Sequence, residues 1–462
     1  MKSYSLKEHF ELRNTRSLRP RRGLGRYFMH AGQAGFNDGS GAIWPVRLAD
    51  GCDSNTLQQG CVYSFTIGGI VGEHTPVSKY RDNEIFLQVD DLQLQSGKDG
   101  AAWEMHGIPS PTDVPAQVSA VTNPSGTFFF LSETSRRLDI LLQRNLGIER
   151  ARAFFRSSGY LELDPPQLVL SGGVERYLNT FKTQYIDHRG KQWQLELPTS
   201  PEFSLKKIIA EGVQRIFALT HAFRNQGELS RHHDPEFMML EWYRIGGTLE
   251  DLIRETEKLI ADIASGLLGT ASLPRRPWPV FSVRELFNSI LDIDLEKMSD
   301  VQIFRDSASH RCTSVVPTDS WDDVFCKLFM EFVEPILAQK EACFVAYYPQ
   351  QMGALAAKNT KLNGVVDRFE AYIGGVEICN GYRELIDYED FLKRVSLVEI
   401  ERNDISRDPL FEAAMRSGLY PCVGNALGLD RLIAVLRGER DLQSILPWPF
   451  ASRFPNSTIA LE

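Results

Sequence analysis

The chain has 462 residues, 43% of them apolar and 24% charged, and its formal net charge is −9. This length exceeds one ordinary hydrophobic core, so we expect a soluble globular protein of two or three domains. No apolar run is long enough to span a bilayer and the N-terminus lacks the apolar segment of a secretory signal, so a cytoplasmic enzyme is the default expectation.

The first 26 residues carry a local excess of positive charge. Eight Lys or Arg residues and two Glu residues lie between Lys2 and Arg26, whereas residues 1–130 as a whole hold 12 basic and 13 acidic residues. Such a basic arm could contact RNA phosphates or an acidic partner, or it could be a solvated, flexible terminus.

Residues 1–95 alternate short apolar runs with turn-forming residues. The runs are GRYFMHAG, AIWPVRLADG, CVYSFTIGGIVG and EIFLQVDDLQLQ. This pattern predicts a small all-β barrel or sandwich domain. Residues 96–130 are rich in Pro, Gly and Ser and predict a linker, after which we expect a mixed helix and strand domain over 131–462.

A helical periodicity opens the second domain. In TSRRLDILLQRNLGIERARAFFRSSG, apolar residues recur at helical spacing as far as Phe155, and Gly159 is expected to end the helix. A short extended segment, YLELDPP, follows and stops at Pro165 and Pro166. Further along the chain, DDVFCKLFMEFVEPILAQ predicts an amphipathic helix and ACFVAYYP predicts a strand.

The next pattern predicts an antiparallel hairpin with a polar loop, in IFALTHAFRNQGELSRHHDPEFMMLEWYR. Arg224 ends its first strand. Alternation along the second strand places four side chains on one face: Phe237, Met239, Glu241 and Tyr243. An Arg, an aromatic ring and a carboxylate on one face could hold a phosphate, a flat base and a cation. The alternative is an amphipathic hairpin that packs on its Met, Leu and Trp side and binds nothing.

A second hairpin, in RFEAYIGGVEICNGYRELIDYED, carries carboxylates in a segment patterned for burial. With the two glycines of IGGV as the turn, Tyr372 pairs with Glu377 and Ala371 with Ile378. Glu370 and Glu377 are then diagonal neighbours on one face, roughly 7–8 Å apart. Two carboxylates at that separation could grip a hard cation such as magnesium.

Glu384 does not fit this alternation, because seven residues from Glu377 reverse the face. It shares parity with Asn380 and Tyr382, so we infer a bulge or kink near Gly381. The alternative for the whole segment is an exposed acidic sheet face without a ligand.

Near the C-terminus a Gly-rich turn leads into a helix, in GNALGLDRLIAVL. Glycines let a ligand approach the backbone closely, and Arg431 lies in the first helical turn. Turns of this kind are common, so this pattern alone does not identify a ligand.

In their order and spacing, these segments resemble the signature motifs of class II aminoacyl-tRNA synthetases of the lysine-handling branch. The segment FFRSSGYLELDPP resembles motif 1, which forms the dimer interface in the family, FRNQGELSRHHDPEF resembles motif 2, and GLDR resembles motif 3. The resemblance covers about residues 131–462. It implies an α+β fold, an antiparallel sheet with flanking helices, and a homodimer, while the N-terminal strands resemble a reduced OB-fold.

The resemblance also implies how ATP and Mg²⁺ would be bound. Arg224 would hold the α-phosphate and Arg431 the γ-phosphate, while Phe237 would stack on adenine. Glu370 and Glu377 would carry magnesium. Three further motif 2 positions would contact ATP: Gln226, Glu228 and His233.

The amino-acid pocket is implied in the same way. Glu202, in PTSPEF, would receive the backbone-side ammonium of the substrate, with Asn380 beside it. The residues that would grip the ε-ammonium of lysine are Glu241, Tyr243 and Glu384.

Two groups within this branch are candidates. Lysyl-tRNA synthetases carry an N-terminal OB-fold that binds the anticodon, whereas elongation factor P lysine ligases attach β-lysine to a lysine of that factor and usually lack such a domain. The segments MLEWYR and FVEPILAQKEACFVAYYPQQMGALA resemble the ligases. Ala426 stands where lysyl-tRNA synthetases have glycine and would reshape the pocket floor. We therefore expect ATP-dependent activation of lysine or β-lysine and its transfer to elongation factor P.

Two alternatives remain at this point. Charging of tRNA with lysine is favoured by the OB-like strands and the basic arm. A non-catalytic paralogue that binds amino acid, nucleotide or RNA is suggested by two motif 2 positions, where Gln226 replaces a glutamate and Asp234 replaces an asparagine.

Overall fold

The computed structural model describes residues 21–30, 33–37, 43–48, 62–71, 86–96, 127–227, 229–267, 274–402, 404–439 and 441–453, with the backbone alone before residue 139. Contacts divide the chain into two compact units, Met1–Ile140 and Leu141–Glu462. Most of the basic arm and of the expected linker, and Glu228, lie outside the described residues. No helix in the described part is long and apolar enough to cross a membrane.

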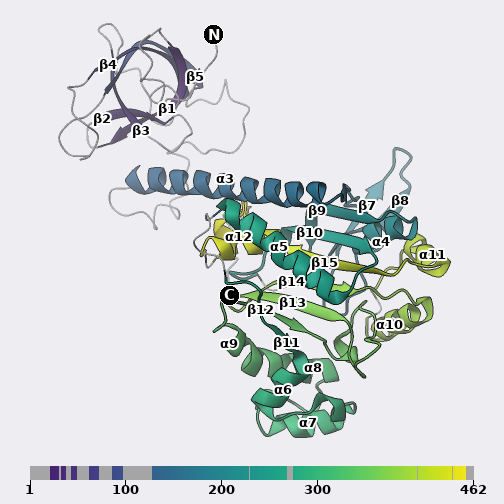
Figure 1. The fold of residues 1–462 in the computed structure, drawn as a ribbon. Coiled ribbons are helices and arrows are strands. Elements are labelled where there is room, and N and C mark those ends of the chain that lie inside the picture. Colours follow the sequence, from purple (N-terminus) through teal and green to yellow (C-terminus); the bar gives the residue numbers. More distant parts are fainter. Residues whose placement is uncertain are drawn as a thin grey trace. The chain divides into compact units, whose positions relative to one another are not determined.

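The first unit contains a closed five-stranded barrel, in the order β1–β2–β3–β5–β4 (Figure 1). Its strands are β1 (Arg21–His30), β2 (Gln33–Asn37), β3 (Ile43–Leu48), β4 (Val62–Val71) and β5 (Phe86–Ser96). Neighbouring strands are antiparallel except β3 and β5, which are parallel. A small all-β unit was expected here, but the sequence patterns did not single out β2.

A long helix, α3 (Thr127–Ser157), opens the helical part of the chain. It ends before Gly159, as predicted, and Gly159 has a φ of 75°, which glycine adopts without steric cost. The helix begins at Thr127, so the last four residues of the expected linker are helical. No Gly or Pro follows Gly126 until Gly147, and nothing in that run stops the helix from extending upstream.

An eight-stranded sheet forms the centre of the second unit, in the order β11–β12–β13–β14–β15–β10–β9–β6 (Figure 1). Its strands are β6 (Leu161–Glu162), β9 (Arg215–Phe223), β10 (Glu236–Ile245), β11 (Val280–Ser282), β12 (Ala342–Ala346), β13 (Arg368–Ile373), β14 (Val376–Arg383) and β15 (Cys422–Gly428). Only the edge pairs β11–β12 and β6–β9 are parallel. This confirms the predicted α+β fold with an antiparallel sheet. A separate hairpin joins β7 (Phe181–Ile186) and β8 (Gln192–Leu197).

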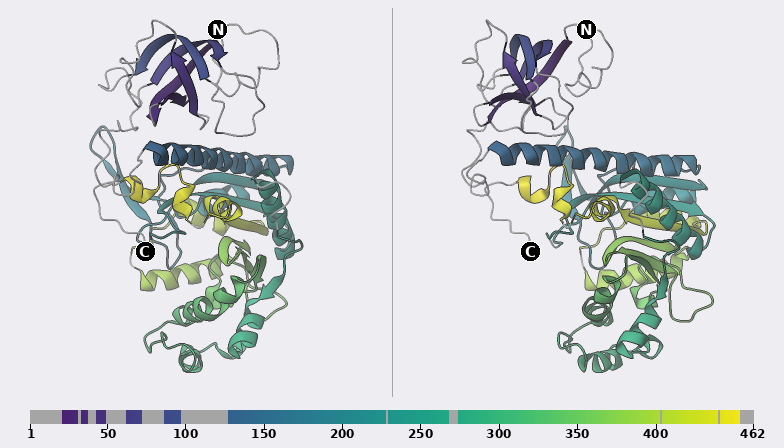
Figure 2. Two further views of the ribbon diagram at one scale, coloured as in Figure 1. Left: turned by 90° about the vertical axis from the view of Figure 1, so that its left-hand side faces the viewer. Right: turned by 60° about the vertical axis from the view of Figure 1, so that its left-hand side comes forward.

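Helices pack on both faces of this sheet and beyond one edge (Figures 1 and 2). They are α4 (Glu202–Ala210), α5 (Leu249–Leu267), α6 (Val283–Leu291), α7 (Val301–Ser309), α8 (Trp321–Leu328), α9 (Glu334–Leu337), α10 (Tyr388–Glu401), α11 (Pro409–Ser417) and α12 (Leu429–Leu436). A π-helical turn, Phe329–Val333, joins α8 to α9, and short 3-10 helices span Leu295–Lys297, Gln350–Met352, Leu442–Ser444 and Phe450–Arg453.

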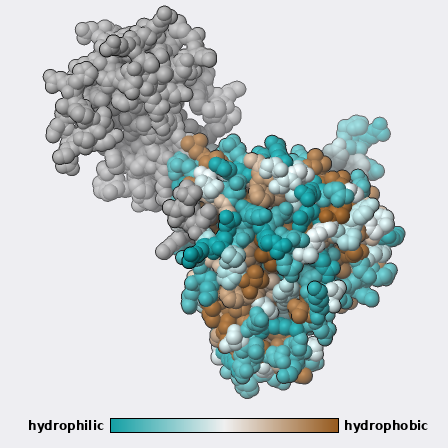
Figure 3. Space-filling view, in the orientation of Figure 1, coloured by the Kyte–Doolittle hydropathy of each residue, from teal (hydrophilic) through white to brown (hydrophobic). Residues whose placement is uncertain are grey.

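The apolar cores explain how these helices are held. On one face, Phe155 of α3 stacks on Phe217 with ring centroids 4.9 Å apart and lies 5.1 Å from Trp242. On the other face, α4, α10 and α11 meet through Phe203, Phe391 and Phe411 in a core shared with β9 and β10. Helices α6 to α9 form a third core with β12. On the side of the second unit seen in Figure 3, hydrophobic residues form small patches between hydrophilic ones.

The hairpin of β13 and β14 has the predicted two-residue turn. Gly374 and Gly375 have φ values of 56° and 82°, the left-handed conformation that such turns require. Tyr372 pairs with Glu377, also as predicted.

Beyond that pair the predicted register is wrong. Ala371 pairs with Cys379 rather than with Ile378, so the bulge lies at Ile378 and not near Gly381. Because the extra residue is Ile378, the side chain of Asn380 points to the same face as Glu377, whereas the predicted register had placed it on the opposite face. All three carboxylates of the segment therefore share one face of the sheet.

Candidate active site

A cavity of about 1210 Å³ lies over the middle of the eight-stranded sheet. This volume is large enough for more than one ligand of metabolite size. All the described residues that the sequence singled out line it: Glu202, Arg224, Gln226, His233, Phe237, Glu241, Tyr243, Glu370, Glu377, Asn380, Glu384, Ala426 and Arg431.

Strand pairing brings these residues together from distant parts of the chain. Ala426 of β15 pairs with Glu241 of β10 on one side and with Asn380 of β14 on the other. Gly424 likewise pairs with Tyr243. Directly paired residues point to the same face of a sheet, so the methyl group of Ala426 lies on the cavity floor between two polar side chains.

Two arginines give one part of the cavity a positive charge. The Arg224 guanidinium lies 5.1 Å from the centroid of the Phe237 ring, and its buried Nε has no hydrogen-bond partner among the described residues. Burial lowers the pKa of Arg224, Glu175 opposes this shift, and the charge of Arg431 adds to it. Arg431 itself donates a 2.9 Å hydrogen bond to the backbone oxygen of Glu377. Two neighbouring guanidinium groups with an unused donor fit an anion that has several oxygens.

Asp234 and Gln226, the two unusual motif 2 residues, have different surroundings in the structure. Asp234 is buried, and its two oxygens accept hydrogen bonds from the backbone N–H groups of Glu236 at 3.2 Å and Phe450 at 2.9 Å. A carboxylate has two acceptor oxygens, whereas the side chain of asparagine has one. Asp234 can therefore accept both hydrogen bonds, and the bond from Phe450 connects the motif 2 loop to the C-terminal segment. Gln226 lines the cavity with a positive φ of 53°.

Glu370 and Glu377 lie in the same cavity but have different surroundings. Glu370 accepts hydrogen bonds from Arg368 at 2.6 Å, Tyr348 at 2.5 Å and Tyr372 at 2.6 Å. Burial raises the pKa of Glu377 to about 6, and the charge of Glu370 adds to this shift. Two carboxylates that repel each other fit a divalent cation.

No cluster of three or more His, Cys, Asp or Glu side chains forms a ready-made metal centre in the described part of the chain. Mg²⁺ in nucleotide sites is commonly held by one or two carboxylates together with substrate phosphates. Glu370 and Glu377 fit that arrangement.

The carboxylate of Glu241 accepts hydrogen bonds from two hydroxyl groups. Ser200 donates to one of its oxygens at 2.6 Å and Tyr243 to the other at 2.5 Å. Burial, and secondly the charge of Glu202, raise the pKa of Glu241 to about 8. A cationic ligand beside Glu241 would stabilise its ionised form.

Lys206 is the main residue that the sequence reasoning missed. Its side chain is buried, and its Nζ forms ion pairs with Glu202 and, at 2.6 Å, with Glu384. Burial lowers the pKa of Lys206, but the two carboxylates more than offset this and raise it above its usual value. The spacing of four residues from Glu202 was a visible signal, but the sequence did not show whether Lys206 or the adjacent Lys207 is the buried one.

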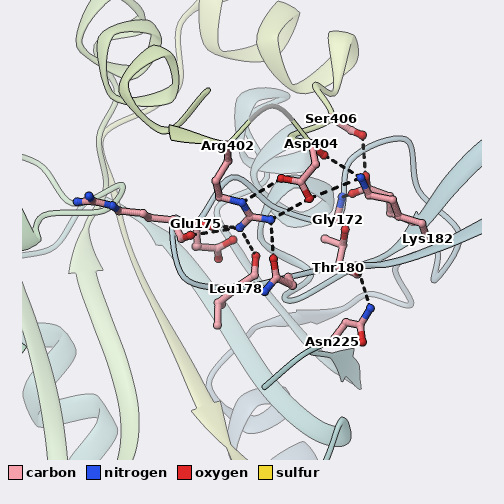
Figure 4. Close-up of polar contacts among 12 residues, drawn as sticks. Gly172, Glu175, Leu178, Thr180, Lys182, Asn225, Arg402, Asp404 and Ser406 are labelled. Carbon is pink, nitrogen blue, oxygen red and sulfur yellow. Dashed lines mark hydrogen bonds and ion pairs between the residues drawn. The ribbon is translucent and has the colours of Figure 1, made fainter. Parts of the chain in front are cut away.

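One wall of the cavity is a loop that Arg402 holds in place. Its Nη1 donates to the backbone oxygens of Glu175 at 3.1 Å and Leu178 at 2.7 Å, and its Nη2 donates to the Asn179 side chain at 2.8 Å (Figure 4). Asp404 accepts from the same guanidinium at 3.1 Å. The segment after α10 thus fixes the loop that carries Glu175 toward Arg224.

The family model for class II tRNA synthetases (D, K and N) matches residues 128–452. The chain belongs to this family. The matched region contains the eight-stranded sheet and the whole cavity. As a class II synthetase-type protein, the chain is an ATP-dependent ligase.

Similar curated proteins are elongation factor P–(R)-β-lysine ligases. The one from Hamiltonella defensa subsp. Acyrthosiphon pisum is 31% identical over 324 residues, which are 69% of this chain and 97% of that protein. The one from Vibrio vulnificus is 33% identical over 320 residues, 68% of this chain and 96% of that protein. The one from Haemophilus ducreyi is 31% identical over 315 residues, 67% and 93% respectively.

Proposed function

We propose that this class II ligase activates lysine or (R)-β-lysine with ATP and transfers it to a lysine side chain of elongation factor P. The observation that carries the proposal is a cavity lined both by two neighbouring arginines, Arg224 and Arg431, and by a group of carboxylates around Lys206, which are Glu202, Glu241 and Glu384. Within the described residues, neither oxygen of Glu384 accepts a hydrogen bond of regular geometry, and only the Lys206 ion pair compensates its charge. A buried carboxylate in that state is a natural acceptor for a substrate ammonium. The choice of elongation factor P as the proposed acceptor of the amino acid rests on the names of the similar proteins.

The first step needs no nucleophile from the protein. The carboxylate of the amino acid attacks the α-phosphorus of ATP, the bond to the β-phosphate oxygen breaks, and pyrophosphate leaves. Arg224 and Arg431 would stabilise the charge that develops on the phosphate oxygens, and Phe237 would stack on adenine. His233, Gln226 and Glu228 would complete the ATP contacts. Mg²⁺ held by Glu370 and Glu377 would neutralise phosphate charge when bound.

The second step joins the amino acid to its acceptor. The ε-amine of the acceptor lysine attacks the adenylate carbonyl, AMP leaves with the electrons of the broken bond, and an amide forms with release of a proton. Glu202 and Asn380 would hold the backbone-side ammonium during both steps, and Glu241, Tyr243 and Glu384 would hold the ε-ammonium. The methyl group of Ala426 on the cavity floor supports a preference for β-lysine.

A second candidate acceptor is tRNA. The five-stranded barrel favours it, because OB-folds are five-stranded barrels that bind oligonucleotides. We propose that residues 1–95 belong to an OB-like accessory domain and 131–462 to the catalytic domain, joined by the expected linker of 96–130, whose last four residues belong to α3.

We also propose a homodimer formed through motif 1. Strand β6 lies at an edge of the sheet, and Leu161 on it is 52% exposed. A location in the cytoplasm follows from the proposed acceptor, a factor of translation.

Amino-acid-dependent exchange of pyrophosphate into ATP tests the activation step. We expect exchange with Mg²⁺ and either lysine or (R)-β-lysine, and at least about tenfold less with norleucine, which lacks the ε-ammonium that the carboxylates would bind. Equal exchange with norleucine would contradict the assignment of the carboxylate pocket. No exchange with either cationic amino acid would favour the non-catalytic paralogue.

A further inference from the structure

Lys206 is a buried cation that forms ion pairs with Glu202 and Glu384, two of the carboxylates that line the pocket we assign to a cationic substrate. It lies one turn after Glu202 on α4, its relative exposure is 1%, and its Nζ is 5.8 Å from the centroid of the Tyr243 ring. Its ion pairs join α4 to Glu384, which directly follows β14. A buried ammonium between two carboxylates that line a substrate pocket calls for an explanation beyond stability, because a buried ion pair is weak evidence for stabilisation.

Each ion pair engages one oxygen of its carboxylate and leaves the other. Lys206 contacts Oε1 of Glu202 and Oε2 of Glu384. The opposite oxygen of Glu384 faces Gly424 on the cavity floor, where a Cβ atom would lie 2.6 Å from it. The Lys206 ammonium therefore bridges the two carboxylates through one oxygen of each.

Without Lys206, Glu202 and Glu384 would be neighbouring carboxylates in a desolvated site. Their repulsion would favour protonation of one of them, and a neutral carboxyl group is a poor acceptor for an ammonium. Burial already raises the pKa of Glu384 to about 7 in spite of Lys206, which acts in the opposite direction. The ammonium therefore favours the ionised form of Glu384 and holds this carboxylate beside Glu202 before substrate binds.

We propose that Lys206 is a positioning and specificity residue: it holds one oxygen of Glu202 and one of Glu384, and so sets the spacing at which the pocket accepts two substrate ammonium groups. The inference rests on the proposed function, since it assumes that these carboxylates bind a diamino acid. It predicts that loss of Lys206 impairs amino-acid binding more than the chemical step, and that selectivity for chain length falls.

The test compares Lys206→Met with wild type in pyrophosphate exchange. We expect the KM for lysine or (R)-β-lysine to rise about 10- to 100-fold, with kcat and the KM for ATP within about threefold of wild type. The preference for lysine over ornithine, which is one methylene shorter, should fall by about tenfold. Lys207→Met is the matched control, because Lys207 is the next residue on α4 and pairs with Asp408 outside the cavity lining.

Chemical rescue separates a positioning role from a structural one. In Lys206→Ala, n-propylammonium replaces the missing part of the side chain and should lower the amino-acid KM at least about tenfold, whereas propan-1-ol should not. A folded Lys206→Met with wild-type KM and selectivity overturns the proposal, as does equal rescue by the alcohol. Should Lys206→Met not fold, Lys206→Arg must still change the amino-acid KM, and an unchanged KM in the folded Arg variant overturns it. Absence of exchange in wild type would instead count against the proposed function.

Discussion

Replacing Arg224 by alanine is expected to lower amino-acid-dependent pyrophosphate exchange by about 10³-fold or more. The guanidinium lies beside the Phe237 ring, and its buried Nε has no hydrogen-bond partner among the described residues. In the role that we propose for Arg224, a charge-assisted donor to the α-phosphate would act mainly when charge develops in the transition state, so kcat should fall more than the affinity for ATP. Arg224→Lys should retain intermediate activity, because it keeps the charge but loses the planar fork of donors.

The fold should survive this change. The Arg224 side chain lies over the Phe237 ring and its Nε makes no hydrogen bond within the described residues, so the melting temperature of Arg224→Ala should stay within a few degrees of wild type. Arg215→Ala is the matched control: Arg215 is the first residue of β9, the strand that Arg224 directly follows, its side chain donates to the backbone oxygen of Ser158 at 2.9 Å, and it is not part of the cavity lining. Normal exchange by folded Arg224→Ala would refute the phosphate assignment.

Replacing Gly424 by alanine is expected to lower kcat/KM for the amino acid by about 100-fold, with little change in the KM for ATP. A Cβ atom there would lie 2.6 Å from Oε1 of Glu384 and closer still to the Tyr243 ring. Both side chains line the cavity, so the added methyl group must displace the residues that would grip the ε-ammonium. The backbone of Gly424 does not have a positive φ, so the effect comes from this collision and not from strain.

The control for this variant is Ala426→Gly. It alters the same strand and the same face two residues further on, but it removes a methyl group instead of adding one. We expect lysine to bind to Ala426→Gly with a KM within about tenfold of wild type and the preference between α-lysine and β-lysine to change. Wild-type amino-acid kinetics in Gly424→Ala would show that Tyr243 and Glu384 do not form the substrate pocket.

Alternation along regular strands predicted much of the site. Phe237 and Glu241 share a face of β10 as the sequence indicated, because nothing interrupts that strand. The bulge at Ile378 could not be placed, because it depends on which residues of β13 face β14 and not on local pattern. The motif resemblance supplied the roles of the arginines and carboxylates, which the structure brings into one cavity but does not test.

The ion pairs were harder to anticipate than the strands. Lys206 and Lys207 are adjacent and both fit a helix, and only the packing of α4 on β9 and β10 decides which one is buried. The same holds for Asp234, whose partner Phe450 is 216 residues away in sequence. Contacts of this kind depend on how the elements pack in three dimensions, and they produce no periodic pattern in the sequence.

The most direct test of the central claim is a competition between acceptors. The full chain would be incubated with ATP, Mg²⁺ and labelled (R)-β-lysine or lysine in the presence of elongation factor P and total tRNA together. Mass spectrometry of the protein and acid precipitation of the RNA then show where the label resides. We predict a mass increase on one lysine of elongation factor P, with tRNA unlabelled. Label on tRNA and none on the factor would contradict this account and identify the chain as a tRNA-charging enzyme.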